Sequence, residues 1–232
     1  MNQIDQVDWA RIGGDLDAQG WAVAKALLGA EVCAGLSMLY EEDGRFRGTV
    51  TMARHGFGRG EYRYFAYPLP GIVADLRTQL YARLAPIANC WNRTMGIDTA
   101  FPDNHADFLA RCHAAGQARP TPLILRYGPG DYNCLHQDLY GEHVFPLPAA
   151  ILLDRPEKDF TGGEFLLTEQ RPRMQSRGSV VPLRQGDAVI FAVNQRPVQG
   201  SRGPYRVTMR HGVSALRSGR RHTLGIILHD AT

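Results

Sequence analysis

The sequence predicts an α+β fold, in which an antiparallel barrel or jelly roll is supported by helices from the first half of the chain. Helical patterns lie before residue 120, and short β-type runs separated by Gly, Pro, Asp and Asn follow it. Because strands do not alternate with helices, a doubly wound parallel sheet is disfavoured. The length of 232 residues fits one domain, with mainly helical support in 1–120 and the jelly-roll core in 121–232.

Three segments of the first half have apolar residues at helical spacing, and one is extended. Ala30–Glu42 and Gly71–Trp91 each place apolar side chains on one stripe, as expected of helices that pack on an apolar surface. Phe101–Gly116 predicts a third, weaker helix. Gly20–Leu27 is more typical of an edge strand.

The second half predicts about eight short strands, each bounded by turn-forming residues. These runs, rich in β-branched and aromatic residues, are Leu123–Tyr127, His136–Tyr140, Ala149–Leu153, Glu164–Thr168, Ser179–Leu183, Ala188–Val193, Tyr205–Val213 and His222–Leu228.

The composition is that of an ordinary globular chain. Hydrophobic residues make up 44% and charged residues 21%, which is enough apolar matter for a core and argues against disorder. The longest apolar runs fall far short of the ~20 residues that cross a bilayer, and the N-terminus lacks a basic-then-apolar leader. We therefore expect a cytoplasmic protein without a membrane partner. The sequence does not predict an oligomeric state.

Positive charge is concentrated late in the chain, although the net charge is only +3. Eleven arginines lie between Gln170 and His222, against a single acid, Asp187. This segment is a candidate surface for a polyanion. The alternative is that these guanidinium groups simply solvate the exposed faces of strands. That alternative does not explain why acids are missing.

Two side chains of metal-ligand type, His136 and Asp138, stand two residues apart in a strand-like run. Alternate residues of a strand point to the same face, so we expect imidazole and carboxylate to converge on one point. His211, seventy-five residues beyond His136 in another β-type run, completes a 2-His-1-carboxylate set. Such a set leaves coordination positions open and suits Fe(II) with a bidentate co-substrate and dioxygen. On position alone, His222 and His229 remain alternatives for the third ligand.

The segment after His211 favours that residue. Gly219 follows it by eight residues and Arg221 by ten. If a turn follows the strand of His211, the next strand brings Arg221 back toward the metal. Its planar guanidinium can there hold a carboxylate through two parallel hydrogen bonds. Thr223 lies two residues further, shares the strand face and adds a hydroxyl donor.

This constellation resembles the 2-oxoglutarate- and Fe(II)-dependent oxygenases, specifically the subset with an arginine ten residues after the distal histidine, as in prolyl hydroxylases. The resemblance implies Fe(II), 2-oxoglutarate and O2 as cofactors, with Arg221 and Thr223 as co-substrate contacts. In such relatives a tyrosine nine residues before the first ligand histidine also contacts 2-oxoglutarate, and Tyr127 occupies that position. The alternative for Tyr127 is an amphipathic core tyrosine.

Longer segments are similar to a bacterial oxygenase family grouped as nucleic-acid modifying. The resemblance covers the chain from about Val23 to Ala231, and implies a double-stranded β-helix and a base in DNA or RNA as substrate. The chain departs from the AlkB repair group, in which the co-substrate arginine lies further beyond the distal histidine. The segments that carry the resemblance are Arg54–Tyr62, Tyr67–Pro70, His136–Glu142, Phe160–Phe165, Thr168–Met174 and Arg220–Gly225.

Six further residues are candidates for substrate contacts. Residues 55–62, with Arg59 and Tyr62, are rich in Gly, Arg and aromatic residues, as expected of a lid that stacks on a flipped base. The same segment could instead be a packing loop with glycines at positive φ. Three more are phosphate-contact candidates with a solvated basic loop as the alternative: Arg171, Arg173 and Arg177. The sixth candidate for a substrate contact is Arg217, from the arginine-rich segment.

The leading functional hypothesis is oxidative demethylation or dealkylation of nucleobases in DNA or RNA, in repair or modification, with a single-stranded partner favoured. The runner-up is a protein or small-molecule hydroxylase of the prolyl hydroxylase type. A third interpretation is a binding module that has lost turnover. The complete ligand set and Arg221 argue against it.

Overall fold

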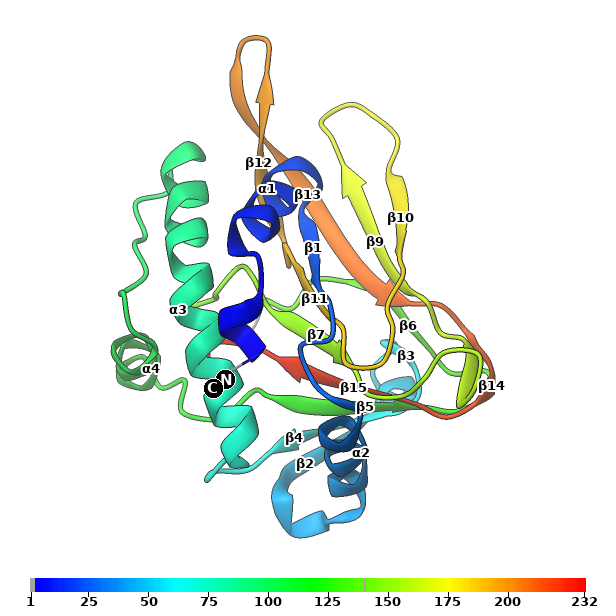
Figure 1. Ribbon diagram of the computed structural model, residues 1–232. Coiled ribbons are helices and arrows are strands. Elements are labelled where there is room, and N and C mark those ends of the chain that lie inside the picture. The colour runs from blue at the N-terminus through cyan, green and yellow to red at the C-terminus, as the bar shows by residue number, and fades with distance from the viewer. Residues whose placement is uncertain (1–2, 140) are drawn as a thin grey trace.

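Two antiparallel β-sheets form the framework of the computed structural model, which describes residues 3–139 and 141–232 (Figure 1). The seven-stranded sheet has the order β1 (Trp21–Ala24), β11 (Ala188–Phe191), β7 (Ala149–Leu152), β15 (Arg221–Ile226), β5 (Leu123–Tyr127), β4 (Glu61–Phe65) and β2 (Phe46–Thr51). The six-stranded sheet has the order β10 (Arg177–Val181), β9 (Phe165–Gln170), β13 (Gly203–Val213), β6 (Tyr132–His136) and β3 (Gly58–Arg59), with β12 (Gln195–Gly200) paired to β13. A third, two-stranded sheet joins β14 (Leu216–Gly219) to β8 (Phe160–Gly162).

The α-helices of the described residues all lie in the first half of the chain, as predicted. No helix in this part of the chain combines the length and hydrophobicity needed to span a bilayer. The helices are α1 (Trp9–Gln19), α2 (Ala30–Met38), α3 (Gly71–Thr94) and α4 (His105–Ala114), and short 3-10 turns cover Gln3–Gln6, Leu39–Glu41, Asp43–Arg45 and Met52–Arg54.

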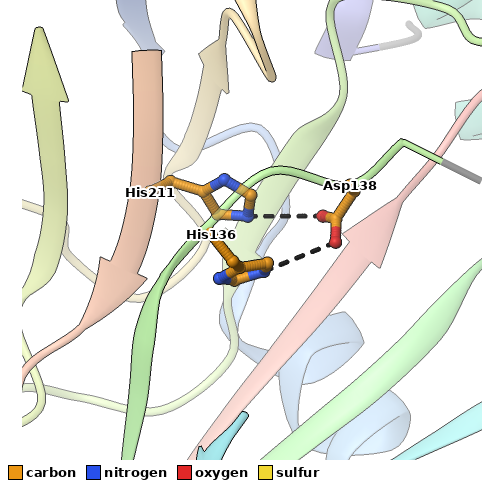
Figure 2. A group of neighbouring side chains, drawn as sticks. All are labelled: His136, Asp138 and His211. Carbon is orange, nitrogen blue, oxygen red and sulfur yellow. Dashed lines mark ion pairs between the residues drawn. The ribbon is translucent and has the colours of Figure 1, made fainter. Parts of the chain in front are cut away.

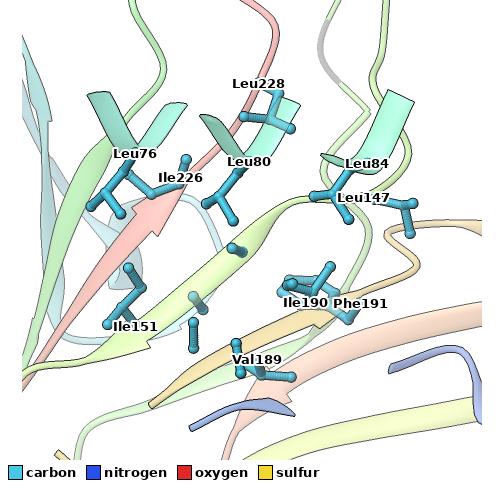
Figure 3. Packing of buried hydrophobic residues seen from close by; sticks show 14 of the residues in the cluster. Leu76, Leu80, Leu84, Leu147, Ile151, Val189, Ile190, Phe191, Ile226 and Leu228 are labelled. Carbon is cyan, nitrogen blue, oxygen red and sulfur yellow. The ribbon is translucent and has the colours of Figure 1, made fainter. Parts of the chain in front are cut away.

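The core forms where α3 lies against the seven-stranded sheet (Figure 3). Leu76, Leu80 and Leu84 recur every four residues, so they share one face of α3 and are buried. They pack in one cluster with side chains of the sheet such as Ile151 and Ile190. Removing this apolar surface from water is the main force that fixes the helix on the sheet. The α+β jelly roll with supporting helices is therefore confirmed.

The first half is less purely helical than the pattern predicted. It also contributes β2, β3 and β4, which the sequence analysis missed, and the helix Trp9–Gln19. Two adjacent glycines weaken the helical signal of α1, yet Asp8 caps its first turn, and the helix buries its own side chains Ile12 and Leu16. Within residues 55–62, Gly58 has the positive φ that the packing alternative expected, and the role of the segment as a lid stays a prediction. Gly58 has φ 128°, and a Cβ there would lie 2.3 Å from the Tyr132 carbonyl oxygen.

The predicted strand His136–Tyr140 is wrong in its bounds. Strand β6 ends at His136, and Asp138 lies in the irregular segment that follows; Tyr140 is outside the described residues. His136 is the last residue of β6 that pairs with β13. The backbone pairing stops there because the Gln137 side chain, rather than a backbone N–H, donates to the Met209 carbonyl of β13 at 2.8 Å.

Two buried histidines lie where the end of the chain meets the helices. The His105 Nε2–H donates to the Leu228 carbonyl at 2.8 Å, and the His229 Nδ1 accepts from the Phe145 N–H at 3.1 Å. Burial lowers the pKa of each imidazole to about 4, and the nearby Arg77 guanidinium acts in the same direction. Both histidines are therefore neutral in the folded chain at pH 7.

We predict that the free energy of unfolding falls as the pH drops from about 6.5 to about 4. The unfolded chain protonates these histidines near pH 6.5, whereas the folded chain resists until about pH 4. Each histidine accounts for roughly 3 kcal/mol over that window. Urea unfolding at several pH values should show that the free energy of unfolding falls less between pH 6.5 and pH 4 in His105→Gln than in the exposed control His55→Gln. The glutamine side chain keeps a hydrogen-bond donor at position 105. Equal pH dependence of the two variants would contradict the assignment.

Candidate active site

A cavity of about 300 Å³ lies between the two large sheets. Most of its lining side chains are apolar or aromatic, contributed by both sheets, with a few polar groups among them, which is the usual make-up of a small-molecule site. The sequence-predicted residues that line this one cavity are His136, Asp138, His211, Tyr127, Arg221, Thr223 and Tyr62.

His136, Asp138 and His211 converge at the wall formed by β6 and β13 (Figure 2). Their ligating atoms all lie within 4.8 Å of one another. The Asp138 carboxylate faces both rings, with Oδ1 3.4 Å from the His136 Nε2 and Oδ2 3.3 Å from the His211 Nε2. The two histidines are side by side because β13 pairs with β6 in the register that sets His211 opposite His136.

The donor set of this cluster fits a bound cation. The His136 Nδ1 lies 2.7 Å from the Cys134 carbonyl, which can only accept, so Nδ1 carries a proton and Nε2 faces Asp138. The neutral ring can offer its Nε2 lone pair, beside the carboxylate, to one cation. Without a cation, burial would lower the pKa of His136, but the hydrogen bond and charge attraction to Asp138 raise it. Burial alone would raise the pKa of the Asp138 carboxyl, but hydrogen bonds and charge attraction from His136 and His211 hold it well below its usual value.

Gln137, between His136 and Asp138, was not singled out from the sequence. Its Nε2 donates to the Asn194 Oδ1 and to the Met209 carbonyl, each at 2.8 Å. The second bond ties the irregular segment that carries Asp138 to β13, two residues before His211. The only signal in the sequence was its position between two ligand-type residues.

A buried arginine stands on the opposite sheet of the cavity. Arg221 is 2% exposed, and its Nη1 donates to the Thr223 Oγ1 at 2.6 Å. Among the described residues no carboxylate forms an ion pair with it, and its Nε and the Tyr127 hydroxyl are buried without hydrogen-bond partners. Burial lowers the pKa of Arg221, but the guanidinium stays protonated at pH 7 because arginine does not lose its proton in proteins. Burial raises the pKa of Tyr127, so its hydroxyl remains a donor at pH 7. An uncompensated buried cation beside free donors fits an anionic ligand.

Strand pairing brings these groups together. β15 is antiparallel to β5, with Arg221 opposite Tyr127, and Thr223 follows on the same face as Arg221. The turn into β15 depends on Gly219, which has φ 80°, and a Cβ there would lie 2.0 Å from the Asp159 carbonyl oxygen. A glycine at this position is therefore required to return the chain toward the cavity.

The remaining predicted substrate residues do not line the cavity. Arg59 is exposed on the edge strand β3, and Arg217 is exposed and 3.5 Å from the Glu164 carboxylate. Arg171, Arg173 and Arg177 lie in or beside the β9–β10 hairpin. Their roles stay predictions. The cavity lining adds Phe57, whose side chain is 43% exposed, from the segment predicted as a lid.

An antiparallel jelly roll whose cavity joins a 2-His-1-carboxylate cluster to a buried arginine is the arrangement of the 2-oxoglutarate-dependent oxygenases, and this chain is an enzyme of that class. It belongs to the Oxygenase-NA family, described as oxygenases catalysing oxidative methylation of damaged DNA, whose model matches residues 60–231. The predicted grouping with nucleic-acid-modifying oxygenases is thereby confirmed. The cofactors are Fe(II), 2-oxoglutarate and O2.

The chain is also similar to other proteins in sequence or in fold. Uncharacterized proteins of two Mycobacterium tuberculosis strains, CDC 1551 and H37Rv, are 52% identical over 167 residues, which cover 72% of this chain and 72% of theirs. A prolyl-4-hydroxylase of Pseudomonas putida has a TM-score of 0.55 at 15% identity, covering 94% of this chain and 96% of its own. A 2-oxoglutarate-Fe(II) family oxidoreductase of Burkholderia pseudomallei has a TM-score of 0.54 at 17% identity, covering 97% and 92%. At these identities the solved structures show the shared fold alone.

We predict that Gly219→Ala destabilises the chain and displaces Arg221, because the new Cβ meets a backbone carbonyl at a positive φ. Urea unfolding should show a loss on the order of 2 kcal/mol or more. Gly178→Ala is the matched control, since nothing lies within 4 Å of its Cβ position. If the two variants were equally stable, Gly219 would not constrain the turn.

Proposed function

We propose that this oxygenase removes alkyl groups oxidatively from bases of single-stranded DNA or RNA, with iron held by His136, Asp138 and His211. In this proposal Arg221, Thr223 and Tyr127 bind 2-oxoglutarate. The observation that carries it is the single cavity that joins the three-residue cluster to a buried arginine without a counter-ion. The family description, with damaged DNA as substrate, supports the choice of a nucleic acid. A cytoplasmic location remains a prediction.

Each residue has a distinct task in this reaction. The bound iron, 2-oxoglutarate and O2 supply the oxidising chemistry, in which the co-substrate becomes succinate and CO2 and one oxygen atom enters a substrate C–H bond. The three ligands leave coordination positions open for co-substrate and oxygen. Arg221 holds the far carboxylate through its planar guanidinium. Thr223 accepts a hydrogen bond from Arg221, so its own hydroxyl proton remains free to donate.

Hydroxylation of a carbon attached to nitrogen accounts for dealkylation without a further catalytic group. The product is a hemiaminal, whose C–N bond breaks as the hydroxyl proton is lost, releasing an aldehyde and the free base nitrogen. No general base is required. The chain contributes ligand geometry, an apolar cavity wall that limits water, and substrate placement.

Aromatic side chains at the cavity are suited to a flat heterocycle. Phe57, Tyr62 and Tyr64 line one part of it, and the rings of Tyr62 and Tyr64 meet edge to face with centroids 5.3 Å apart. Phe57 is stacked with His55 at 5.3 Å and is half exposed, so it can contact a base that enters from solvent.

A protein or small-molecule hydroxylase is the second candidate. It is favoured by the ten-residue spacing between His211 and Arg221, which resembles the prolyl hydroxylases. The two candidates share the cofactors and differ in the substrate, so stimulation of co-substrate turnover separates them.

We predict that methylated single-stranded DNA or RNA stimulates 2-oxoglutarate decarboxylation above the substrate-free rate. The same strand without the alkyl group should stimulate less, because no reactive C–H bond is offered. Succinate formation and aldehyde release should then rise together at equal amounts. Stimulation by a proline-containing peptide and by no nucleic acid would remove this proposal in favour of the second candidate.

We also predict that Arg221→Ala raises the KM for 2-oxoglutarate by about 100-fold or more, since one partner of a buried, charge-assisted pair is lost. The KM for the nucleic acid should change little. Arg220→Ala is the matched control, because this neighbouring arginine is exposed and does not line the cavity. An unchanged requirement for 2-oxoglutarate in Arg221→Ala would contradict the assigned role.

A further inference from the structure

The six-stranded sheet is almost free of acidic residues. Its strands β3, β6, β9, β10, β12 and β13 contain one carboxylate, Glu169, and five arginines. The connections β9–β10 and β12–β13 add three more arginines and no acid. The chain has 23 acids in all, so their near absence from this sheet is not a matter of composition. The eight arginines are Arg59, Arg171, Arg173, Arg177, Arg196, Arg202, Arg206 and Arg210.

Glu169 does not neutralise this charge. Its side chain is 5% exposed and is shared by Arg196, by the Arg171 Nε at 2.8 Å and by the Arg177 Nη2 at 3.6 Å. Arg196 is itself buried and donates to the Asp17 carbonyl at the end of α1. One carboxylate among three guanidinium groups leaves two positive charges uncompensated.

The five other arginines are exposed and have no ion pair to a carboxylate in the described part of the chain. Arg59 lies apart from the rest, on the edge strand β3. The remaining four form what we call the arm surface: Arg173, Arg202, Arg206 and Arg210. Within the arm surface, the Arg206 side chain donates one hydrogen bond, from Nη2 to the Met95 carbonyl at 2.6 Å. Unpaired, exposed guanidinium groups are the usual contacts to phosphates.

The arm surface lies on strands that also form the metal-binding wall, but on the other face of the sheet. Burial alternates along β13, so Arg206 and Arg210 point away from the cavity that His211 lines. The hairpins β9–β10 and β12–β13 project from the body, on the side away from α4 (Figure 1). β9 and β13 pair from Thr208–Gln170 to Val213–Phe165, and His211 pairs with Leu167 at the base of both arms. Along β13, Arg206 lies five residues and Arg202 nine residues before His211, or roughly 17 and 30 Å at ~3.3 Å per residue. A nucleic-acid strand has a phosphate every ~3.4 Å of helix axis, so several phosphates fit this span.

We propose that the arm surface binds the phosphates of the strand that flanks the target base, so that the substrate is a polynucleotide rather than a free nucleoside or nucleotide. This inference rests on the proposed function. It also separates the predicted arginines into two groups. Arg173 is free to bind phosphate, whereas Arg171 and Arg177 are already engaged by Glu169.

The test compares a long and a short ligand. Wild-type chain and the variant Arg173→Gln, Arg202→Gln, Arg206→Gln, Arg210→Gln are titrated with a single-stranded DNA of about 20 nucleotides and with a trinucleotide, at several salt concentrations. A triple variant that keeps Arg206, and hence its contact with Met95, guards against a folding defect. The control removes the same charge elsewhere, by Arg45→Gln, Arg83→Gln, Arg111→Gln and Arg119→Gln, all exposed.

We expect the arm variant to bind the long strand at least about 10-fold more weakly, with the slope of log affinity against log salt smaller by about 3, from four lost phosphate contacts at ~0.7 each. Trinucleotide binding and trinucleotide-stimulated decarboxylation should not change, and the control should match wild type. Equal losses in arm variant and control would overturn the inference while leaving the proposed function intact. The inference would also be overturned if the wild-type chain bound a polyglutamate peptide as tightly as it binds DNA. If neither oligonucleotide binds or stimulates the wild-type enzyme, both proposals fail.

Discussion

The register between β13 and β6 is the constraint on which the site depends. It sets His211 opposite His136, with ring centroids 4.2 Å apart, and the same strand pairs through His211 with Leu167 on β9. Because side chains alternate between faces, a slip of one residue would turn His211 out of the cavity. The extended pairing with β9 makes such a slip costly, so the position of His211 relative to His136 is fixed by a ladder of backbone hydrogen bonds rather than by contacts within the cluster.

The end of the cavity that carries Arg221 depends on a separate part of the fold. Arg221 belongs to the seven-stranded sheet, which α3 holds in place through the apolar core (Figure 3). The distance between the His136, Asp138 and His211 cluster and this arginine is therefore set by how the two sheets pack. A buried guanidinium without a carboxylate partner costs folding free energy in the free protein. An anionic ligand that binds Arg221 would supply the missing negative charge and offset this loss of folding free energy.

The sequence predicted the chemistry better than the local structure that delivers it. Spacing identified His136, Asp138, His211 and Arg221, because motif distances reflect the strands and turns that return the chain. It did not predict that Asp138 lies beyond its strand, since the end of β6 is set by pairing with β13 and by the Gln137 side chain. Strands β2 to β4 were missed because their Arg- and Gly-rich sequences gain their burial only from long-range pairing.

The most direct test of the account is metal binding by the three-residue cluster. Calorimetric titration with Mn(II), in the presence of 2-oxoglutarate, should show binding to the wild-type chain and to His222→Gln, in which a nearby non-ligand histidine is changed. His136→Ala, Asp138→Ala and His211→Ala should each weaken binding by about 100-fold or more, with the fold retained by circular dichroism. Wild-type affinity in any of these three variants would contradict the account, because the metal would then be held elsewhere.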